Sequence, residues 1–186
     1  YSLLDGGASV KKLIEQAKLL GMDSLALTDH GNMFGAIEFY SKARAAGINP
    51  ILGMEAYIAP GSRTGREACG IKEASHHLLI LAQNLQGYHN LLKLSSLAYK
   101  EGFYYRPRID RDALEQFHEG LIVTSACMSG EIYGWAGGSL HEWADLWMGR
   151  LFPAQGCEKR NTFCLLFLNW LLEAGRLFFF SVPLFF

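Results

Sequence analysis

Apolar residues recur along residues 10–125 at two spacings, one typical of helices and one of buried strands. Between residues 10 and 20 they follow the i, i+3, i+4, i+7 pattern of an amphipathic helix. Ser9 is placed to cap the start of this helix, and Gly21 to follow its end. Apolar positions predict further helices over residues 35–46, 86–99, 110–118 and 140–151. Short apolar runs predict strands over residues 24–28, 50–54, 77–81 and 120–125.

Strands that alternate with helices are typical of parallel βαβ units. The sequence therefore predicts an α/β fold, either an open doubly wound sheet or a barrel. Residues 59–75 are rich in glycine and are expected to form a loop. The fingerprints GxGxxG and GxxxxGK(S/T) are both absent, so no motif supports a Rossmann or P-loop nucleotide site.

The composition is that of one ordinary domain. The chain has 186 residues, of which 50% are hydrophobic and 19% charged, enough apolar material for a core. The net charge of −1 excludes binding of nucleic acid by bulk charge, so any such contact must come from a local site. Four cysteines without a CxxC pair indicate a reducing, cytoplasmic setting.

The two ends of the chain differ from the middle. The chain starts at Tyr1 without a Met or a signal peptide, which indicates a fragment that begins inside a domain. Seven of the twelve Phe lie within residues 163–186, where Glu173 and Arg176 interrupt an apolar stretch that is too short to span a membrane. We expect a partial domain over 1–153 and an apolar tail over 154–186, produced by a disrupted reading frame, with a transmembrane tail as the alternative.

Metal-capable side chains follow three of the expected strands. His30 comes just after the strand at 24–28, Glu55 after the strand at 50–54, and Cys127 after the strand at 120–125. The carboxyl ends of strands in α/β folds meet at one rim, where ligands bind. Asp5 and His77 are further candidates, although His77 precedes its strand and the strand-end rule does not place it there.

Imidazole, carboxylate and thiolate groups together suit zinc or a related first-row metal. Each residue also has a purely structural interpretation. His30 can be a hydrogen-bonded structural residue, Asp29 a turn residue, and Cys127 a small buried apolar residue. Glu55 is harder to explain without a partner, because a carboxylate in an apolar strand is costly unless it is paired or bound to metal. His76 and His77 face opposite ways in an extended chain, so at most one of them enters a site.

One further stretch, KEGFYYRPR at residues 100–108, interleaves aromatic and basic residues. Such a stretch can stack on bases and hold phosphates. The alternative is a loop whose aromatic side chains pack on the core.

Several sequence blocks in this chain, taken together and in order, resemble the PHP (polymerase and histidinol phosphatase) domain found at the start of bacterial DNA polymerase III alpha subunits. The blocks are YSLLDG at 1–6, LTDHGNMFG at 27–35, GMEAYIAP at 53–60, HLLILA at 77–82, NLLKL at 90–94, EGFYY at 101–105 and EGLIVTSAC at 119–127. The resemblance covers residues 1–153 and does not extend into the tail.

The resemblance implies a distorted (βα)7 barrel of the PHP type, incomplete in this chain, with a site for up to three zinc or manganese ions. The family's ligand positions correspond to Asp5, His30, Glu55, His77 and Cys127, all of which carry ligand-capable side chains here. Asp29 matches a family position that is better interpreted as a partner of the ligands than as a ligand. A His-x-His pair is expected just before Tyr1 and an Asp-x-His pair well beyond the point where the tail departs from the family, after a shift in frame, so this chain holds only part of the ligand set.

The resemblance also implies a function in DNA replication. The intact protein would be a DNA-directed DNA polymerase subunit, a nucleotidyltransferase, whose PHP domain hydrolyses phosphodiesters at a DNA 3′ end as a 3′–5′ exonuclease. DNA and other subunits of the replicative polymerase would be its partners, in the cytoplasm and without a membrane. The fragment alone, without the palm carboxylates, is expected to be inactive. Two alternatives remain: a metal-braced structural and docking module without nuclease activity, and a free-standing PHP phosphatase.

Overall fold

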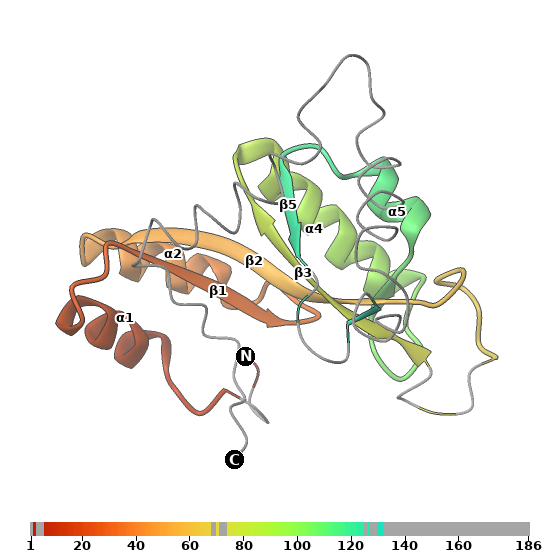
Figure 1. Ribbon diagram of the computed structural model, residues 1–186, viewed down its shortest axis with the longest axis horizontal. Helices are drawn as coiled ribbons and strands as arrows, with labels where there is room; N and C mark the ends of the chain where they lie inside the picture. The colour runs from red at the N-terminus through yellow and green to blue at the C-terminus, as the bar shows by residue number, and fades with distance from the viewer. Residues whose placement is uncertain are drawn as a thin grey trace, which may run out of the picture.

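The computed structural model describes residues 2, 6–67, 70, 74–124, 126, 130 and 131. Every helix and strand expected between residues 10 and 125 is present, and the helix expected at 140–151 lies outside the described residues, as does the tail at 154–186. The elements, labelled in Figure 1, are α1 (Val10–Leu19), β1 (Ser24–His30), α2 (Ala36–Ala45), β2 (Asn49–Ile58), β3 (His76–Ala82), α4 (Leu85–Lys100), β4 (Arg108–Ile109), α5 (Arg111–Gln116) and β5 (Leu121–Thr124).

Helix ends follow local side-chain chemistry. The Ser9 side chain accepts a hydrogen bond from the backbone N–H of Lys12, as expected for the N-cap of α1. Gly21 follows this helix with a φ of 69°, a conformation that glycine adopts without a steric cost. Asn84 caps α4 in the same way, by accepting from the N–H of Gly87. Side-chain capping therefore sets where α1 and α4 begin, as the sequence pattern indicated for α1.

The sheet mixes parallel and antiparallel pairs. Its order is β1–β2–β3–β5, with the short β4 also paired to β2. β1 and β4 run parallel to β2, whereas β3 is antiparallel to both β2 and β5. The α/β class is thus confirmed, but the expectation of parallel units throughout is wrong for β3. An antiparallel return needs no helical crossover between β2 and β3. The loop expected at 59–75 lies partly outside the described residues.

In the described part of the chain the strands form an open, twisted sheet, so the barrel is incomplete there (Figure 1). Helices α2 and α4 lie behind this sheet in the view of Figure 1. Alternate residues of β2 and β3 face α4 in one core cluster, whose largest fully buried members are Met54, Ile58, Ile80, Leu91, Leu94, Ile109 and Leu114. A second cluster joins α1 and α2 to β1 around Phe39, which is fully buried. Both clusters occupy the helix-covered face, and the other face carries Glu55, Tyr57 and His77 beside the buried Leu79 and Leu81.

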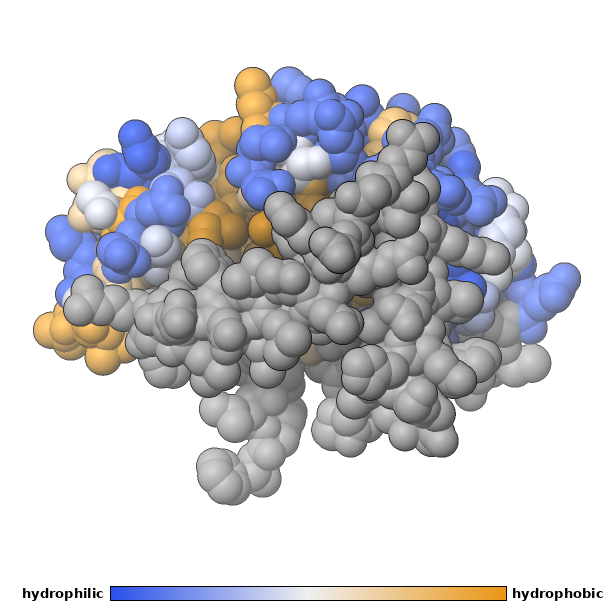
Figure 2. Space-filling view, turned by 45° about the horizontal axis from the view of Figure 1, so that its top comes forward, coloured by the Kyte–Doolittle hydropathy of each residue, from blue (hydrophilic) through white to orange (hydrophobic). Residues whose placement is uncertain are grey.

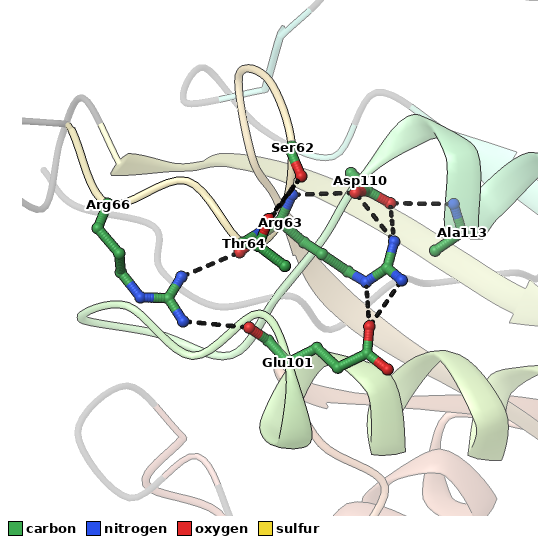
Figure 3. Close-up of polar contacts among 7 residues, drawn as sticks. All are labelled: Ser62, Arg63, Thr64, Arg66, Glu101, Asp110 and Ala113. Atoms are coloured by element: carbon green, nitrogen blue, oxygen red, sulfur yellow. Dashed lines mark hydrogen bonds and ion pairs between the residues drawn. The ribbon is translucent and has the colours of Figure 1, made fainter.

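The loop after β2 is attached to the rest of the domain by arginines (Figure 3). The guanidinium of Arg63 lies between Asp110 and Glu101, with Nη1 3.0 Å from Asp110 Oδ1 and Nε 2.8 Å from Glu101 Oε2. The buried Arg108 donates to four backbone carbonyls, those of residues 63, 65, 74 and 102. These contacts fix the residues around 100–110 next to the carboxyl end of β2.

On the face seen in Figure 2, the described residues that are visible are mostly hydrophilic, with smaller hydrophobic areas between the polar ones. Within the described part of the chain, no helix has the length and hydrophobicity needed to cross a membrane. The apolar stretch at 163–186 lies outside it.

Candidate metal centre

Strand register brings three of the candidate ligands together. In the parallel pair, His30 of β1 lies directly opposite Glu55 of β2. In the antiparallel pair, Tyr57 of β2 lies opposite His77 of β3. Because side chains alternate between the two faces of a strand, residues 55 and 57 share a face, and His77 is a diagonal neighbour of Glu55 on that face. The three ligand candidates thus converge on the face opposite the core of α4.

The Glu55 carboxylate lies between the two imidazoles. Its Oε2 is 2.9 Å from His30 Nδ1, and its Oε1 is 2.6 Å from His77 Nδ1. The Glu55 side chain is only 4% exposed, whereas the two histidine side chains are about one-fifth exposed. A carboxylate this deeply buried needs such partners, because burial of an unpaired charge is costly.

The protonation of Glu55 reflects the same contacts. Burial alone would raise the pKa of its carboxyl group, but hydrogen bonds and charge interactions with His30 and His77 outweigh burial and lower that pKa to about 2. Glu55 is therefore ionised at any pH near neutrality. The site offers a fixed negative charge between two imidazole rings.

Tyr57 forms a wall of the site. Its ring stacks beside His30 with the ring centroids 6.4 Å apart, and it meets the His77 ring edge-on at 5.3 Å. The backbone at Gly31 comes close to Tyr57 as well, since a Cβ atom at Gly31 would lie 2.9 Å from Tyr57 Cε2. These contacts restrict the two imidazoles to the orientations in which they meet Glu55.

Asp29 lies next to the site but on the opposite face of β1 from His30, as expected for adjacent residues of a strand. The Ser2 hydroxyl donates to Asp29 Oδ1 at 2.9 Å and accepts from the backbone N–H of His30 at 3.0 Å. Through the Ser2 hydroxyl, Asp29 therefore helps to hold the backbone that carries His30, which is what a partner of the ligands would do. Ser2 had no recognisable signal in the sequence.

The direction of β3 explains the position of His77. This residue begins its strand, but β3 is antiparallel to β2, so its start lies beside the carboxyl ends of β1 and β2. His76 pairs with Ile58 and lies on the other face, as expected for adjacent residues of a strand, so of the two histidines only His77 lies beside Glu55. Asp5 and Cys127, the other two predicted ligands, lie outside the described residues.

The donor types fit a first-row metal, since two imidazoles and one carboxylate are ligands that zinc and manganese accept. Within the described residues, no three His, Cys, Asp or Glu side chains are arranged to hold an ion at a common centre. Both Glu55 oxygens lie at hydrogen-bond distance from the Nδ1 atoms of His30 and His77. The structure therefore brings together three of the predicted ligands as a cluster of close contacts around Glu55.

The aromatic and basic stretch at 100–108 borders this cluster. Tyr104 packs against the buried Arg108, with 5.0 Å between the guanidinium carbon and the ring centroid, whereas Phe103 and Tyr105 are each 51% exposed. Arg106 lies over the Tyr57 ring, 4.5 Å from its centroid. One aromatic side chain thus packs inward as the loop interpretation expects, and two face solvent as a nucleic-acid contact would require.

The chain is similar to known proteins over most of its length. The sequence matches the PHP domain family over residues 1–146. It is 56% identical over 132 residues to the DNA polymerase III subunit alpha of Borreliella burgdorferi, a match that covers 71% of this chain and 12% of that protein. It is 47% identical over 135 residues to the Aquifex aeolicus protein of the same name, covering 70% of this chain and 12% of that protein.

The solved structure of an amidohydrolase from Chromobacterium violaceum aligns with 50% of this chain and 30% of the amidohydrolase chain. At a TM-score of 0.35 and 22% identity, this likeness adds nothing to the family assignment. The family match alone covers most of the chain, and the chain belongs to the PHP domain family. It spans about an eighth of the length of the alpha subunits it resembles.

Proposed function

We propose that this chain is the PHP part of a bacterial replicative DNA polymerase, and that the sheet face carrying Glu55 binds up to three zinc or manganese ions. The ligands would be His30, Glu55 and His77, together with Asp5 and Cys127. The observation that carries the proposal is the buried Glu55 carboxylate, held between His30 and His77 at 2.9 and 2.6 Å. The identity of 47–56% to DNA polymerase III alpha subunits supports the assignment to replication.

The proposed reaction is hydrolysis of a phosphodiester at a DNA 3′ end, as a 3′–5′ exonuclease that proofreads for the polymerase. Bound metal ions would supply hydroxide at neutral pH and stabilise the charge on the phosphoryl oxygens. Glu55 contributes a carboxylate that stays ionised, because its pKa is about 2. Tyr57 keeps the two imidazoles in place beside it. DNA and the other subunits of the cytoplasmic polymerase holoenzyme would be the partners.

The test is an exonuclease assay on the intact protein that contains this chain, loaded with zinc or manganese, on a 3′-labelled oligonucleotide. We expect Glu55→Gln and His30→Ala each to lower the rate by about 100-fold, the upper range for losing a group that supports a metal. His76→Ala is the matched control, because His76 lies beside His77 in the chain and faces away from the site. If Glu55→Gln retains the rate of the unchanged protein, this site does not perform the hydrolysis.

The close contacts of Glu55 with His30 and His77 favour a second candidate, a structural and subunit-docking module. Glu55 joins three neighbouring strands through His30 and His77, so the cluster can brace the sheet, with or without metal. In that case a chelator or Glu55→Gln would lower the melting temperature and the polymerase activity, with no nuclease activity to lose. A melting temperature that neither treatment changes would exclude the bracing role.

A further inference from the structure

Arg106 lies beside the candidate metal centre on a segment that is held at several points. The segment joins α4 to β4. The carbonyl of Arg106 accepts a hydrogen bond from the N–H of Tyr104 at 3.0 Å, and the next residue, Pro107, packs against Gly31, where an added Cβ would lie 2.9 Å from Pro107 Cγ. Arg108 follows, buried and bonded to four carbonyls. The backbone at Arg106 is therefore fixed relative to β1 and β2.

The side chain of Arg106 is directed at the site. Its guanidinium lies over the Tyr57 ring, 4.5 Å from the centroid, and its Nη1 is 3.4 Å from His77 Nε2. Stacking on an aromatic face orients the planar guanidinium and leaves its N–H edges available. Arginine has only donors, so His77 Nε2 is the acceptor side of this contact.

The partners of Arg106 differ from those of neighbouring arginines. Arg63 pairs with Asp110 and Glu101, and Arg111 pairs with Glu131. In the described part of the chain, no carboxylate lies within 4.0 Å of the Arg106 guanidinium. A guanidinium has five N–H donors, and the described residues take up one of them with the long contact to His77. The positive charge of Arg106 is thus half-buried beside the site without a carboxylate from the described residues.

We propose that Arg106 binds the phosphoryl oxygens of the substrate at the His30–Glu55–His77 site, an inference that rests on the proposed function. A guanidinium that is oriented by stacking and has several unused donors is suited to grip two oxygens of a phosphate at once. Because Arg106 lies beside His77, a phosphate bound by its guanidinium would lie at the His30–Glu55–His77 cluster. Arg106 is a substrate-positioning residue in this scheme, and Tyr57 is the platform that orients it.

The experiment compares Arg106→Gln, Arg106→Lys and Arg44→Gln in the intact protein. Arg44 is an exposed arginine of α2 and serves as the matched control. Three quantities are measured: the Kd for inorganic phosphate, the KM and kcat for the DNA 3′ end, and the affinity for zinc in the absence of substrate. A melting curve of each variant reports its folding.

We expect Arg106→Gln to raise the Kd for phosphate and the KM for DNA by about 10-fold or more, the effect of losing a hydrogen bond between charged groups. Zinc affinity should stay unchanged, and Arg106→Lys should restore part of the binding, because lysine keeps the charge but not the fork. Arg44→Gln should match the unchanged protein. Phosphate Kd and DNA KM within twofold of normal in both Arg106 variants would overturn the assignment of Arg106.

The outcomes separate this inference from the proposed function. If the unchanged protein binds phosphate through Arg106 but does not hydrolyse DNA, the exonuclease proposal fails and the phosphate site stands. If Glu55→Gln abolishes hydrolysis while Arg106→Gln leaves KM and phosphate binding unchanged, the exonuclease proposal stands and the role of Arg106 is refuted. If the unchanged protein neither binds phosphate nor cleaves DNA, both are refuted.

Discussion

Asp110 is the carboxylate on which the network in Figure 3 most depends. It is 4% exposed, and its oxygens accept from the backbone N–H groups of Arg63 and Ala113 at 2.9 and 3.0 Å and from Nη1 of Arg63 at 3.0 Å. Alanine at this position removes the N-cap of α5, which costs about 1 kcal/mol. It also leaves the partly buried donors of Arg63 without an acceptor, which costs about 1–3 kcal/mol. We expect Asp110→Ala to lower the free energy of unfolding by about 2–4 kcal/mol.

Two further variants separate the contributions. Asparagine caps helices as well as aspartate does, so Asp110→Asn can keep the cap of α5. It removes the charge and replaces the second oxygen with an amide nitrogen that cannot accept from Arg63, which should cost about 1–2 kcal/mol. Glu101 binds the same guanidinium from a side chain that is 43% exposed. Since solvent screens exposed ion pairs, Glu101→Gln should cost about 0.5 kcal/mol or less.

The assay is equilibrium unfolding in urea of the full chain and its three variants, followed by circular dichroism. The expected order of destabilisation is Asp110→Ala, then Asp110→Asn, then Glu101→Gln. Equal losses for Glu101→Gln and Asp110→Ala would refute the reasoning, because burial would then not decide the strength of these contacts. A loss below about 1 kcal/mol for Asp110→Ala would refute it as well.

Three other changes test the packing around the site. Burial raises the pKa of Asp110, but hydrogen bonds from Arg63 and Ala113 outweigh burial and hold that pKa below its ordinary value. The stability that the ionised Asp110 contributes is therefore present above about pH 4 and is lost as the pH falls further. On acidification, the urea midpoint should decrease less in Asp110→Asn than in the unchanged chain. Gly31→Ala should lower the melting temperature more than Gly47→Ala does. Both glycines have positive φ angles, but only at Gly31 would the added Cβ clash with Pro107 and Tyr57. Equal effects would contradict the crowding at Gly31. Arg108→Met leaves four carbonyls without their donor and should lower the free energy of unfolding by about 3 kcal/mol or more. Proteolytic cleavage within residues 59–67 should become faster, and an unchanged cleavage rate would show that Arg108 does not hold this loop.

The pairing of His30 with Glu55 could be predicted from sequence because it depends on local pattern. Each residue comes at the end of an apolar run, and the helix at 36–45 between the runs favours a parallel crossover. In such a unit the carboxyl ends of both strands meet at one edge. The strands extend past the apolar runs, through His30 and Ile58, because the sheet pairs them there irrespective of side-chain type.

The rest of the site depends on information that is not local. An apolar run is the same in either direction, so the pattern at 77–81 gave no sign that β3 is antiparallel and delivers His77 at its start. Tyr57 could have been inferred from alternation with Glu55 along an extended strand. The contacts of Arg106 with Tyr57 and His77 join distant parts of the chain, and only the folded arrangement of 100–108 reveals them.

The reversed direction of β3 makes one ligand candidate unusually sensitive to insertion and deletion. The identical imidazoles at 76 and 77 occupy opposite sides of the strand, so a slip of one position in its pairing with β2 would exchange them. Insertions or deletions within β3 should therefore separate His77 from Glu55. Insertions or deletions in the solvent-facing part of the segment between β2 and β3 should be tolerated. Variation among natural or engineered versions of this chain can be interpreted with that distinction.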